Sequence, residues 1–169
     1  MIIPRQNLSS GYEQPRLGLG TWDIRGGEGV ATLLKAFELG YNHVDTAEMY
    51  ENQREIGQAL QEVDRASIFV TSKVPAEKLH REDLLASCQD TLRDLQTDYL
   101  DMFLLHWPNH NVPMEETFGA LKEAHERGWV RSIGVSNFII ERLERANLKS
   151  ALSAAGSQRT SNGALRISL

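Results

Sequence analysis

Short apolar runs alternate with longer amphipathic stretches along this chain. Runs of this length predict β-strands, and the last three are rich in Val, Ile, Phe and Leu, as strands covered on both faces are. The five predicted strands are Leu17–Gly20, Tyr41–Asp45, Ser67–Lys73, Tyr99–His106 and Val130–Ser136.

Four stretches between these runs carry apolar residues at helical spacing, which predicts helices with one buried face. Gly40 follows the first stretch and Gly128 follows the fourth, where a helix end favours glycine. A further helix is expected to begin near Ile139. The four predicted helices are Gly29–Leu39, Glu51–Val63, Arg81–Leu95 and Pro113–Arg127.

The alternation of strands and helices predicts an α/β fold. Strand centres about 30 residues apart match the size of a βα unit, and repeated units favour a parallel sheet with helices packed outside. An open doubly wound sheet and a (β/α)8 barrel both fit this order. The dinucleotide-binding form of the doubly wound sheet requires Gly-x-Gly-x-x-Gly after its first strand. The corresponding segment, Gly18–Asp23, lacks the third glycine, so that fingerprint is absent.

The composition excludes several classes of protein. A length of 169 residues predicts one domain or part of one, and 41% hydrophobic with 24% charged residues is usual for a soluble globular chain. A net charge of −5 without a basic stripe gives no indication of binding to nucleic acid or to an anionic membrane. A single cysteine excludes an internal disulfide. No apolar run suits a membrane span or a secretory signal, so the expected compartment is the cytoplasm.

Polar or ionisable groups stand at the ends of successive predicted strands. The second strand ends at Asp45, the third at Lys73 and the fourth at His106, and Tyr50 follows the second. In a barrel, the carboxyl ends of the strands form one rim. Because side chains alternate along a strand, all three strand-end groups can point inward together. The residues expected to share the inner face are Tyr41, His43 and Asp45; Phe69, Thr71 and Lys73; Met102, Leu104 and His106.

Asp, Tyr, Lys and His at one rim suit the protonation of a carbonyl group that receives a hydride. Tyrosine is a weak acid, with an ordinary pKa of about 10. An ammonium about 4 Å away favours the ionised phenol, and a carboxylate holds that ammonium charged. An imidazole can hold the carbonyl oxygen beside the phenol. A general acid of this kind typically contributes about 10²–10⁴ in rate.

Five motifs in order resemble the aldo-keto reductase family, and they cover residues 15–148. The resemblance implies a partial TIM (β/α)8 barrel, with about five βα units present. It implies NADPH-dependent reduction of aldehydes and ketones to alcohols, with NADH as a further candidate, catalysed by Asp45, Tyr50, Lys73 and His106. The run Asp45–Gly57 is similar to bacterial reductases of diketogluconate or methylglyoxal-type dicarbonyls. The motifs are Gly18–Trp22, His43–Tyr50, Val70–Lys73, Asp98–Pro108 and Gly134–Phe138.

The resemblance also implies binding residues around these four. Ser136 and Asn137 resemble the pair that holds the nicotinamide carboxamide. A small carbonyl compound is the expected partner, and the oligomeric state stays open. The residues expected near the nicotinamide ribose are Gly20, Thr21, Trp22 and Asp45, and those expected at the substrate are Trp22, Tyr50, His106 and Trp107, with the two tryptophans shaping an apolar mouth.

Several of these residues also have a purely structural interpretation, and the chain has alternative functions. Trp22 and Trp107 can be packing aromatics, and Cys88 is expected to be a small buried apolar residue. His43 can simply pack inside the barrel. A non-catalytic binding or regulatory module on the same barrel and an inert fragment are the alternative functions. A divalent metal site would leave Tyr50 and Lys73 without a role, so no metal is expected; its ligands would be His43, Asp45, Glu48 and His106.

The sequence after residue 148 departs from the family pattern. The usual barrel has eight strands and about 250 residues, whereas only five strands are predicted here. Residues 149–169 contain five serines, three basic residues and no acidic residue. We therefore divide the chain into the N-terminal part of a barrel, residues 1–148, and an atypical Ser/Ala-rich tail, residues 149–169. Two origins of the tail stay open: a foreign reading frame or artificial end, and a flexible tail.

Five strands of an eight-stranded barrel are expected to be weakly stable alone. Missing strands would leave inward apolar side chains uncovered and two sheet edges unpaired. The resemblance places the family's phosphate-binding segment in the missing part, so we expect this chain to bind NADPH weakly or not at all.

Overall fold

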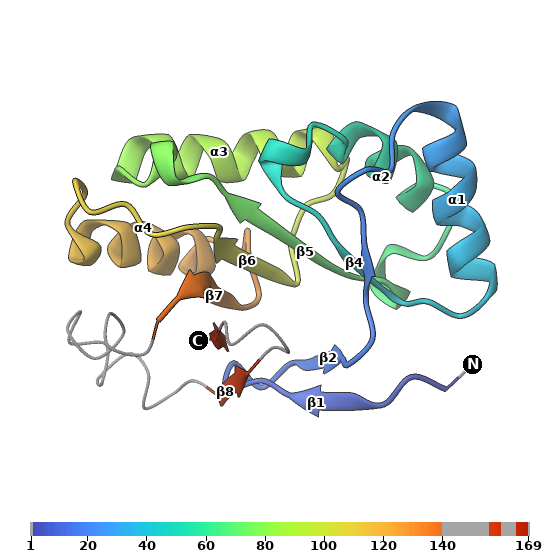
Figure 1. The fold of residues 1–169 in the computed structure, drawn as a ribbon, viewed down its shortest axis with the longest axis horizontal. Helices are drawn as coiled ribbons and strands as arrows, with labels where there is room; N and C mark the ends of the chain where they lie inside the picture. The colour runs from blue at the N-terminus through green and yellow to red at the C-terminus, as the bar shows by residue number, and fades with distance from the viewer. Residues whose placement is uncertain (1, 140–155, 160–164, 169) are drawn as a thin grey trace.

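An open β-sheet with helices along one face forms the centre of the computed structural model, which describes residues 2–139, 156–159 and 165–168 (Figure 1). Five neighbouring strands are parallel: β3 (Leu19–Gly20), β4 (His43–Asp45), β5 (Phe69–Val74), β6 (Met102–Leu105) and β7 (Ile133–Phe138). The helices between them are α1 (Gly26–Glu38), α2 (Gln53–Leu60), α3 (Arg81–Asp94) and α4 (Met114–Glu126).

These elements confirm the five predicted strands and four predicted helices, with shifted ends. Helix α1 begins at Gly26, whose N–H donates to the Glu55 carboxylate of α2 at 3.0 Å. Helix α2 begins later than predicted because Glu51 has a positive φ of 56°. Gly40 and Gly128 have φ of 95° and 76°, as expected for residues that end helices.

The parallel register confirms that the predicted inner-face residues within the strands share one side of the sheet, whereas Tyr41 and His106 lie outside β4 and β6. His43 lies opposite Phe69, and Lys73 lies opposite Leu104. A small inner cluster consists of Leu8, Phe69, Met102 and Leu104. The larger core lies between the sheet and the helices, and it includes Leu33, Ile56, Leu84, Leu121 and the strand residues that point outward: Val44, Val70, Phe103 and Val135.

Several short elements escaped the sequence pattern. Strands β1 (Arg5–Asn7) and β2 (Glu13–Pro15) form an antiparallel hairpin on the side of the sheet away from the helices (Figure 1). Three 3₁₀ helices follow strands or helices: η1 (Glu48–Tyr50), η2 (Arg65–Ser67) and η3 (Ala76–Lys78). Three residues are too few to display a periodicity, so such elements carry no apolar signature.

Two strands extend the sheet beyond β7. Strand β9 (Leu165–Ser168) pairs antiparallel with β7, and β8 (Gly156–Arg159) pairs antiparallel with β9. The sheet stays open, with β3 and β8 as its edge strands. The helix expected near Ile139 lies outside the described residues.

The expectation that missing strands leave the inner face uncovered is wrong for its central residues. Phe69, Met102 and Leu104 are all buried. Leu8, from the turn of the β1–β2 hairpin, packs against them, and β9 covers the edge of β7. The hairpin therefore contributes to covering these inner-face residues, and β9 pairs with the edge of β7.

The described helices are all too short or too polar to cross a membrane.

Candidate active site

The four residues predicted for the rim come together at the carboxyl ends of β4, β5 and β6. Asp45 ends β4, Lys73 lies near the end of β5, and His106 follows β6. Tyr50 ends η1, directly after β4, and the positive φ of Glu51 then turns the chain into α2. This reversal keeps the Tyr50 side chain over the end of the sheet.

The Lys73 ammonium is the centre of the group. Its Nζ donates to Asp45 Oδ1, lies 2.8 Å from the backbone oxygen of Thr46 and lies 3.5 Å from the Tyr50 hydroxyl oxygen. The Lys73 side chain is only 3% exposed, so its charge depends on these acceptors rather than on water. An ammonium in this position favours the ionised form of the phenol.

His106 faces the same phenol. Its ring meets the Tyr50 ring edge-on, with centroids 5.7 Å apart and planes at 78°. Burial, and next the Lys73 ammonium, lower the pKa of His106 to about 4, so the imidazole is neutral near pH 7. The buried Nδ1 has no hydrogen-bond partner among the residues that the structure describes. A neutral imidazole can donate one hydrogen bond to a carbonyl oxygen without itself being a strong acid.

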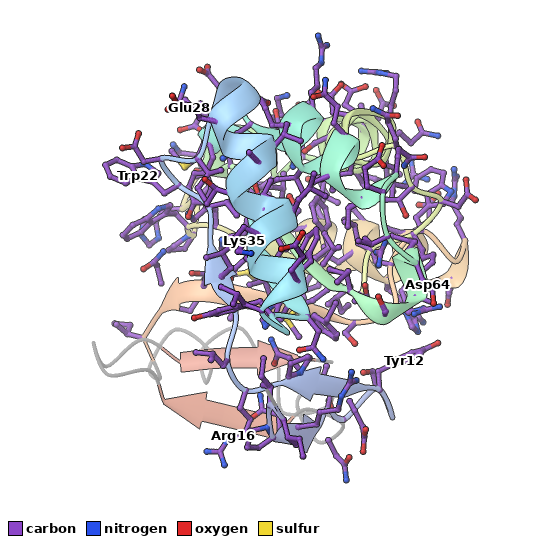
Figure 2. The ribbon with its side chains drawn as sticks, turned by 90° about the vertical axis from the view of Figure 1, so that its right-hand side faces the viewer. Tyr12, Arg16, Trp22, Glu28, Lys35 and Asp64 are labelled. Atoms are coloured by element: carbon purple, nitrogen blue, oxygen red, sulfur yellow. The ribbon has the colours of Figure 1, made fainter. Side chains whose placement is uncertain are left out.

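The loop after β3 lies beside Asp45, as predicted. Thr21 is buried, and both its N–H and its hydroxyl donate to the Asp45 backbone oxygen at 3.1 Å. A Cβ at Gly20 would meet nothing within 4 Å, so open space adjoins that residue. Trp22 is 70% exposed and projects outward from the loop before α1 (Figure 2).

The end of β7 lies beside His106. The Asn137 side-chain amide donates to the His106 backbone oxygen at 2.8 Å and to Ser136 Oγ at 3.2 Å. Asn137 has a positive φ of 61°. Trp107, directly after His106, is 50% exposed. Exposure of both Trp22 and Trp107 contradicts their interpretation as core packing residues.

The described residues suit the nicotinamide end of NADPH. Gly20 leaves space near Asp45, and Ser136 and Asn137 are only partly buried. The Asn137 Oδ1 accepts no hydrogen bond from a described residue, so a carboxamide can pair with it. The predicted binding roles all stay predictions: those of Gly20, Thr21, Trp22, Asp45, Ser136, Asn137 and Trp107.

The alternative metal site does not assemble. His43 is buried between the Pro15 backbone oxygen and Thr71 Oγ1, at 3.2 and 3.0 Å, as an interior packing residue. The Glu48 carboxylate accepts from Lys78 and from Ser87. Within residues 2–139, 156–159 and 165–168, no three His, Cys, Asp or Glu side chains form a possible metal site.

Cys88 is buried in the helix layer, as predicted. Burial raises the pKa of its thiol to about 12, so the reactive thiolate is scarce near pH 7.

A hollow of about 620 Å³ lies away from these residues, at the opposite end of the sheet. Its lining includes Phe37, Tyr41, Asn42 and Val63. None of the four rim residues borders this hollow, so it is not part of the candidate active site.

Two polar residues of the rim escaped the sequence analysis. Thr46 holds the Lys73 ammonium through a backbone oxygen, which leaves no signal in residue types. Asn52 is completely buried directly before α2. Asparagine before a helix is usually a cap, but the Asn52 side chain makes no cap bond. The available signal in the sequence was an asparagine at the expected start of a helix, two residues after Tyr50, but that signal indicates a helix cap rather than a buried residue of the rim.

Comparisons with known proteins agree on one family. The sequence model described as the Aldo/keto reductase family matches residues 16–161. The chain is 41% identical over 136 residues to a protein of Salmonella typhi named methylglyoxal reductase DkgB, covering 78% of this chain and 51% of that protein. It is 42% identical over 139 residues to 2,5-diketo-D-gluconic acid reductase B of a Corynebacterium, covering 80% and 50%.

Solved structures give the same match. A thermostable aldo-keto reductase in complex with the inhibitor epalrestat superposes with a TM-score of 0.82 and 42% identity, covering 87% of this chain and 58% of that one. An aldo-keto reductase of Bombyx mori in complex with NADP gives a TM-score of 0.79 and 29% identity, covering 87% and 54%. The chain spans about half the length of the curated relatives it matches.

Proposed function

Because this chain belongs to the aldo/keto reductase family, we propose that it takes part in the NADPH-dependent reduction of small aldehydes and ketones to alcohols. The observation that carries the proposal is the convergence of Tyr50, Lys73, Asp45 and His106 at one rim. Since the chain spans about half the length of these relatives, the proposal concerns an activity for which longer proteins are named.

Tyr50 is the proposed proton donor. Its hydroxyl hydrogen passes to the carbonyl oxygen, and solvent later restores it. The Lys73 ammonium, 3.5 Å from the hydroxyl oxygen, stabilises the negative charge that the phenol gains. Asp45 keeps that ammonium charged and oriented, because a buried lysine without a carboxylate partner tends to lose its proton.

His106 is the proposed holder of the carbonyl oxygen. A pKa of about 4 leaves the ring neutral, which makes it a hydrogen-bond donor but a poor proton source near pH 7. The edge-on contact with the Tyr50 ring keeps the two side chains next to each other. The two residues therefore have separate roles, in which His106 orients the substrate and Tyr50 supplies the proton.

Ser136 and Asn137 are the proposed contacts of the nicotinamide carboxamide, with Gly20, Thr21, Trp22 and Asp45 around the ribose. NADPH, when bound, supplies the hydride that reduces the carbonyl carbon. Asn137 also fixes the backbone oxygen of His106 at 2.8 Å. One side chain would therefore link the cofactor contact to the residue that orients the substrate.

Small dicarbonyl compounds are the proposed substrate class. The relatives' names refer to methylglyoxal and to 2,5-diketo-D-gluconic acid. Trp22 and Trp107 are both exposed and would give the mouth apolar walls, which suit a compact substrate. Action in the cytoplasm is part of this proposal.

Carbonyl-dependent NADPH consumption tests the proposal. The full chain is mixed with NADPH and methylglyoxal, and loss of the reduced cofactor is followed optically. Tyr50→Phe removes the acidic hydrogen and should lower the rate about 10²–10⁴-fold. Tyr41→Phe makes the same change at the opposite end of β4 and should leave the rate unchanged. Undiminished turnover in Tyr50→Phe would contradict the acid assignment, and no turnover in either parent or control would favour the inert fragment or binding module.

A further inference from the structure

Asn52 is a completely buried carboxamide between two loops of the rim. It lies two residues after Tyr50, and its exposed fraction is 0%. Its Nδ2 donates to the backbone oxygens of Thr21 and Ile24, at 2.5 and 3.0 Å. Its Oδ1 accepts from the Thr46 hydroxyl at 3.0 Å. One side chain thus connects the loop after β3 to the loop after β4.

Thr46 continues this connection to the proposed reaction centre. Its hydroxyl bonds Asn52, while its backbone oxygen accepts from the Lys73 ammonium at 2.8 Å. Its own N–H donates to the Thr71 backbone oxygen at 2.9 Å, which fixes it to β5. The path from the ammonium to Asn52 therefore runs through one buried residue held on both sides.

Trp22 lies in the turn that Asn52 holds. The turn closes through a bond from the Ile24 N–H to the Thr21 oxygen at 3.0 Å, and the carbonyl oxygens of both residues accept from Asn52. The indole itself is 70% exposed and projects outward (Figure 2). With so little side-chain burial, the place of the indole depends on the backbone of the turn.

We propose that Asn52 is a positioning residue that sets the place of Trp22 relative to Lys73 and Tyr50. The structure ties the Trp22 turn to this buried amide directly, and it ties the Lys73 ammonium to the same amide through Thr46. Asn52 thereby sets the width of the mouth without touching the substrate. The effect on substrates rests on the proposed function, whereas the placement of the turn does not.

Only a carboxamide meets all three partners at once. The two carbonyl oxygens require N–H donors, and the Thr46 hydroxyl requires an acceptor. An ionised carboxylate has the same shape but no donor, and it would face both carbonyl oxygens. Asn52→Asp therefore removes the tie to the turn without opening a cavity.

Gln53 offers a matched control. It is also a buried carboxamide, one residue further along, but it donates to Ser72 Oγ and Thr91 Oγ1 in the helix layer, at 2.7 and 3.4 Å. Hydroxyl groups can rotate to donate to a carboxylate, so Gln53→Glu makes the same chemical change away from the Trp22 turn.

Fluorine NMR of the full chain labelled with 5-fluorotryptophan tests the proposal. The three tryptophans give three signals, and Trp22→Phe identifies the one from Trp22. In Asn52→Asp the Trp22 signal should shift and narrow as the turn loosens, while the signals of Trp107 and Trp129 stay in place. Gln53→Glu should leave the Trp22 signal unchanged. Thr46→Val removes only the hydroxyl that orients Asn52 and should give a smaller shift of the same kind.

An unchanged Trp22 signal in Asn52→Asp would overturn the proposal. An equal displacement of all three signals would also overturn it, since that would report a general loss of structure. If Asn52→Asp does not fold, the Trp22 signal of Thr46→Val decides in the same way.

Kinetics give a second test when NADPH is consumed. In Asn52→Asp, KM for methylglyoxal should rise more than kcat falls, and a fall in kcat at constant KM would contradict the role at the mouth. A chain that consumes no NADPH yet has the specific Trp22 shift would fail the proposed function and keep this inference.

Discussion

Two carboxylates, the buried Asp101 and the partly buried Asp45, lie at opposite ends of the sheet and bind cations in different ways. At the amino ends of the strands, Asp101 accepts from Arg65 and from Arg131 at 3.0 Å and from the Val70 N–H at 2.9 Å. Both guanidinium groups lie over the Tyr99 ring, at 4.3 and 3.7 Å from its centre. Both guanidinium groups thus bind the Asp101 carboxylate, and both lie against the Tyr99 ring.

At the carboxyl ends of the strands, Asp45 pairs with Lys73, which also contacts other groups. Lys73 divides its ammonium among Asp45, the Thr46 oxygen and the more distant Tyr50 hydroxyl. His106 keeps a buried Nδ1 without a partner among the described residues, and Trp107, the next residue along the chain, is 50% exposed.

The difference separates a structural ion cluster from the cluster that we propose to be reactive. The Asp101 cluster joins residues 65, 70, 101 and 131, which come just before or at the starts of three neighbouring strands, and its hydrogen bonds are used within the protein. The rim keeps hydrogen-bonding capacity for a molecule from outside. In parallel barrels the carboxyl-end rim carries chemistry and the opposite end carries stability, and the proposed function assigns the two ends of this open sheet in the same way.

Lys73→Met should produce the largest effect on the rim. Loss of the ammonium removes the charge that stabilises the ionised phenol, so carbonyl-dependent NADPH consumption should fall about 10²–10⁴-fold. Unfolding in urea, followed by circular dichroism, should show a smaller loss of stability than Asp101→Asn. If Lys73→Met loses as much stability as Asp101→Asn and still consumes NADPH at the parent rate, Lys73 would be a structural residue rather than a reactive one.

Asp101→Asn should be the most destabilising change at the amino ends. It leaves Arg65 and Arg131 without their carboxylate, and breaking a buried pair costs about 3 kcal/mol when one partner is partly exposed, as Arg131 is. The urea midpoint measures the loss. Asp98→Asn, the same change at an exposed position three residues earlier, should have almost no effect. Equal midpoints for the two variants would disprove the structural role.

The free energy of unfolding should fall as the pH is lowered, because His106 at the rim resists protonation in the folded protein. The pKa of His106 is about 4 in the folded protein, below its ordinary value, so the unfolded chain binds a proton first as the pH falls. This contribution to stability is complete above about pH 6.5 and is lost between about pH 6.5 and 4, amounting to up to about 3 kcal/mol. His106→Gln should flatten this part of the stability curve, and His110→Gln, at an exposed position, should not. A slope that persists in His106→Gln would assign it to other groups.

Ser10→Ala should give the smallest change. The Ser10 hydroxyl bonds the buried Ser132 hydroxyl at 2.7 Å and ties the β1–β2 turn to the start of β7. Leaving Ser132 without this partner should cost about 1 kcal/mol in the free energy of unfolding, measured in urea. A loss as large as that of Asp101→Asn would mean that the hairpin, rather than the ion cluster, holds the amino ends together.

Local patterns were enough to predict the strands, the helices and the four rim residues. Alternation along each strand placed Asp45, Lys73 and His106 on one face, because parallel strands align their ends. The hairpin, η1 and the Asp101 cluster were not predicted, since they depend on contacts between distant positions. Arg65 and Asp101, for example, are 36 residues apart. The tail at residues 149–169 stays a prediction from composition, although residues 156–159 and 165–168 form strands.

Transfer of deuterium from NADPH deuterated at the reactive carbon of its nicotinamide tests the assignment of the rim most directly. The chain is incubated with this cofactor and methylglyoxal, and the alcohol is analysed by mass spectrometry. We predict a product with one deuterium on the newly reduced carbon, formed by the parent chain and far less by Tyr50→Phe. Absence of deuterated alcohol, or equal amounts from both proteins, would contradict a rim that delivers a proton from Tyr50 to a carbonyl group.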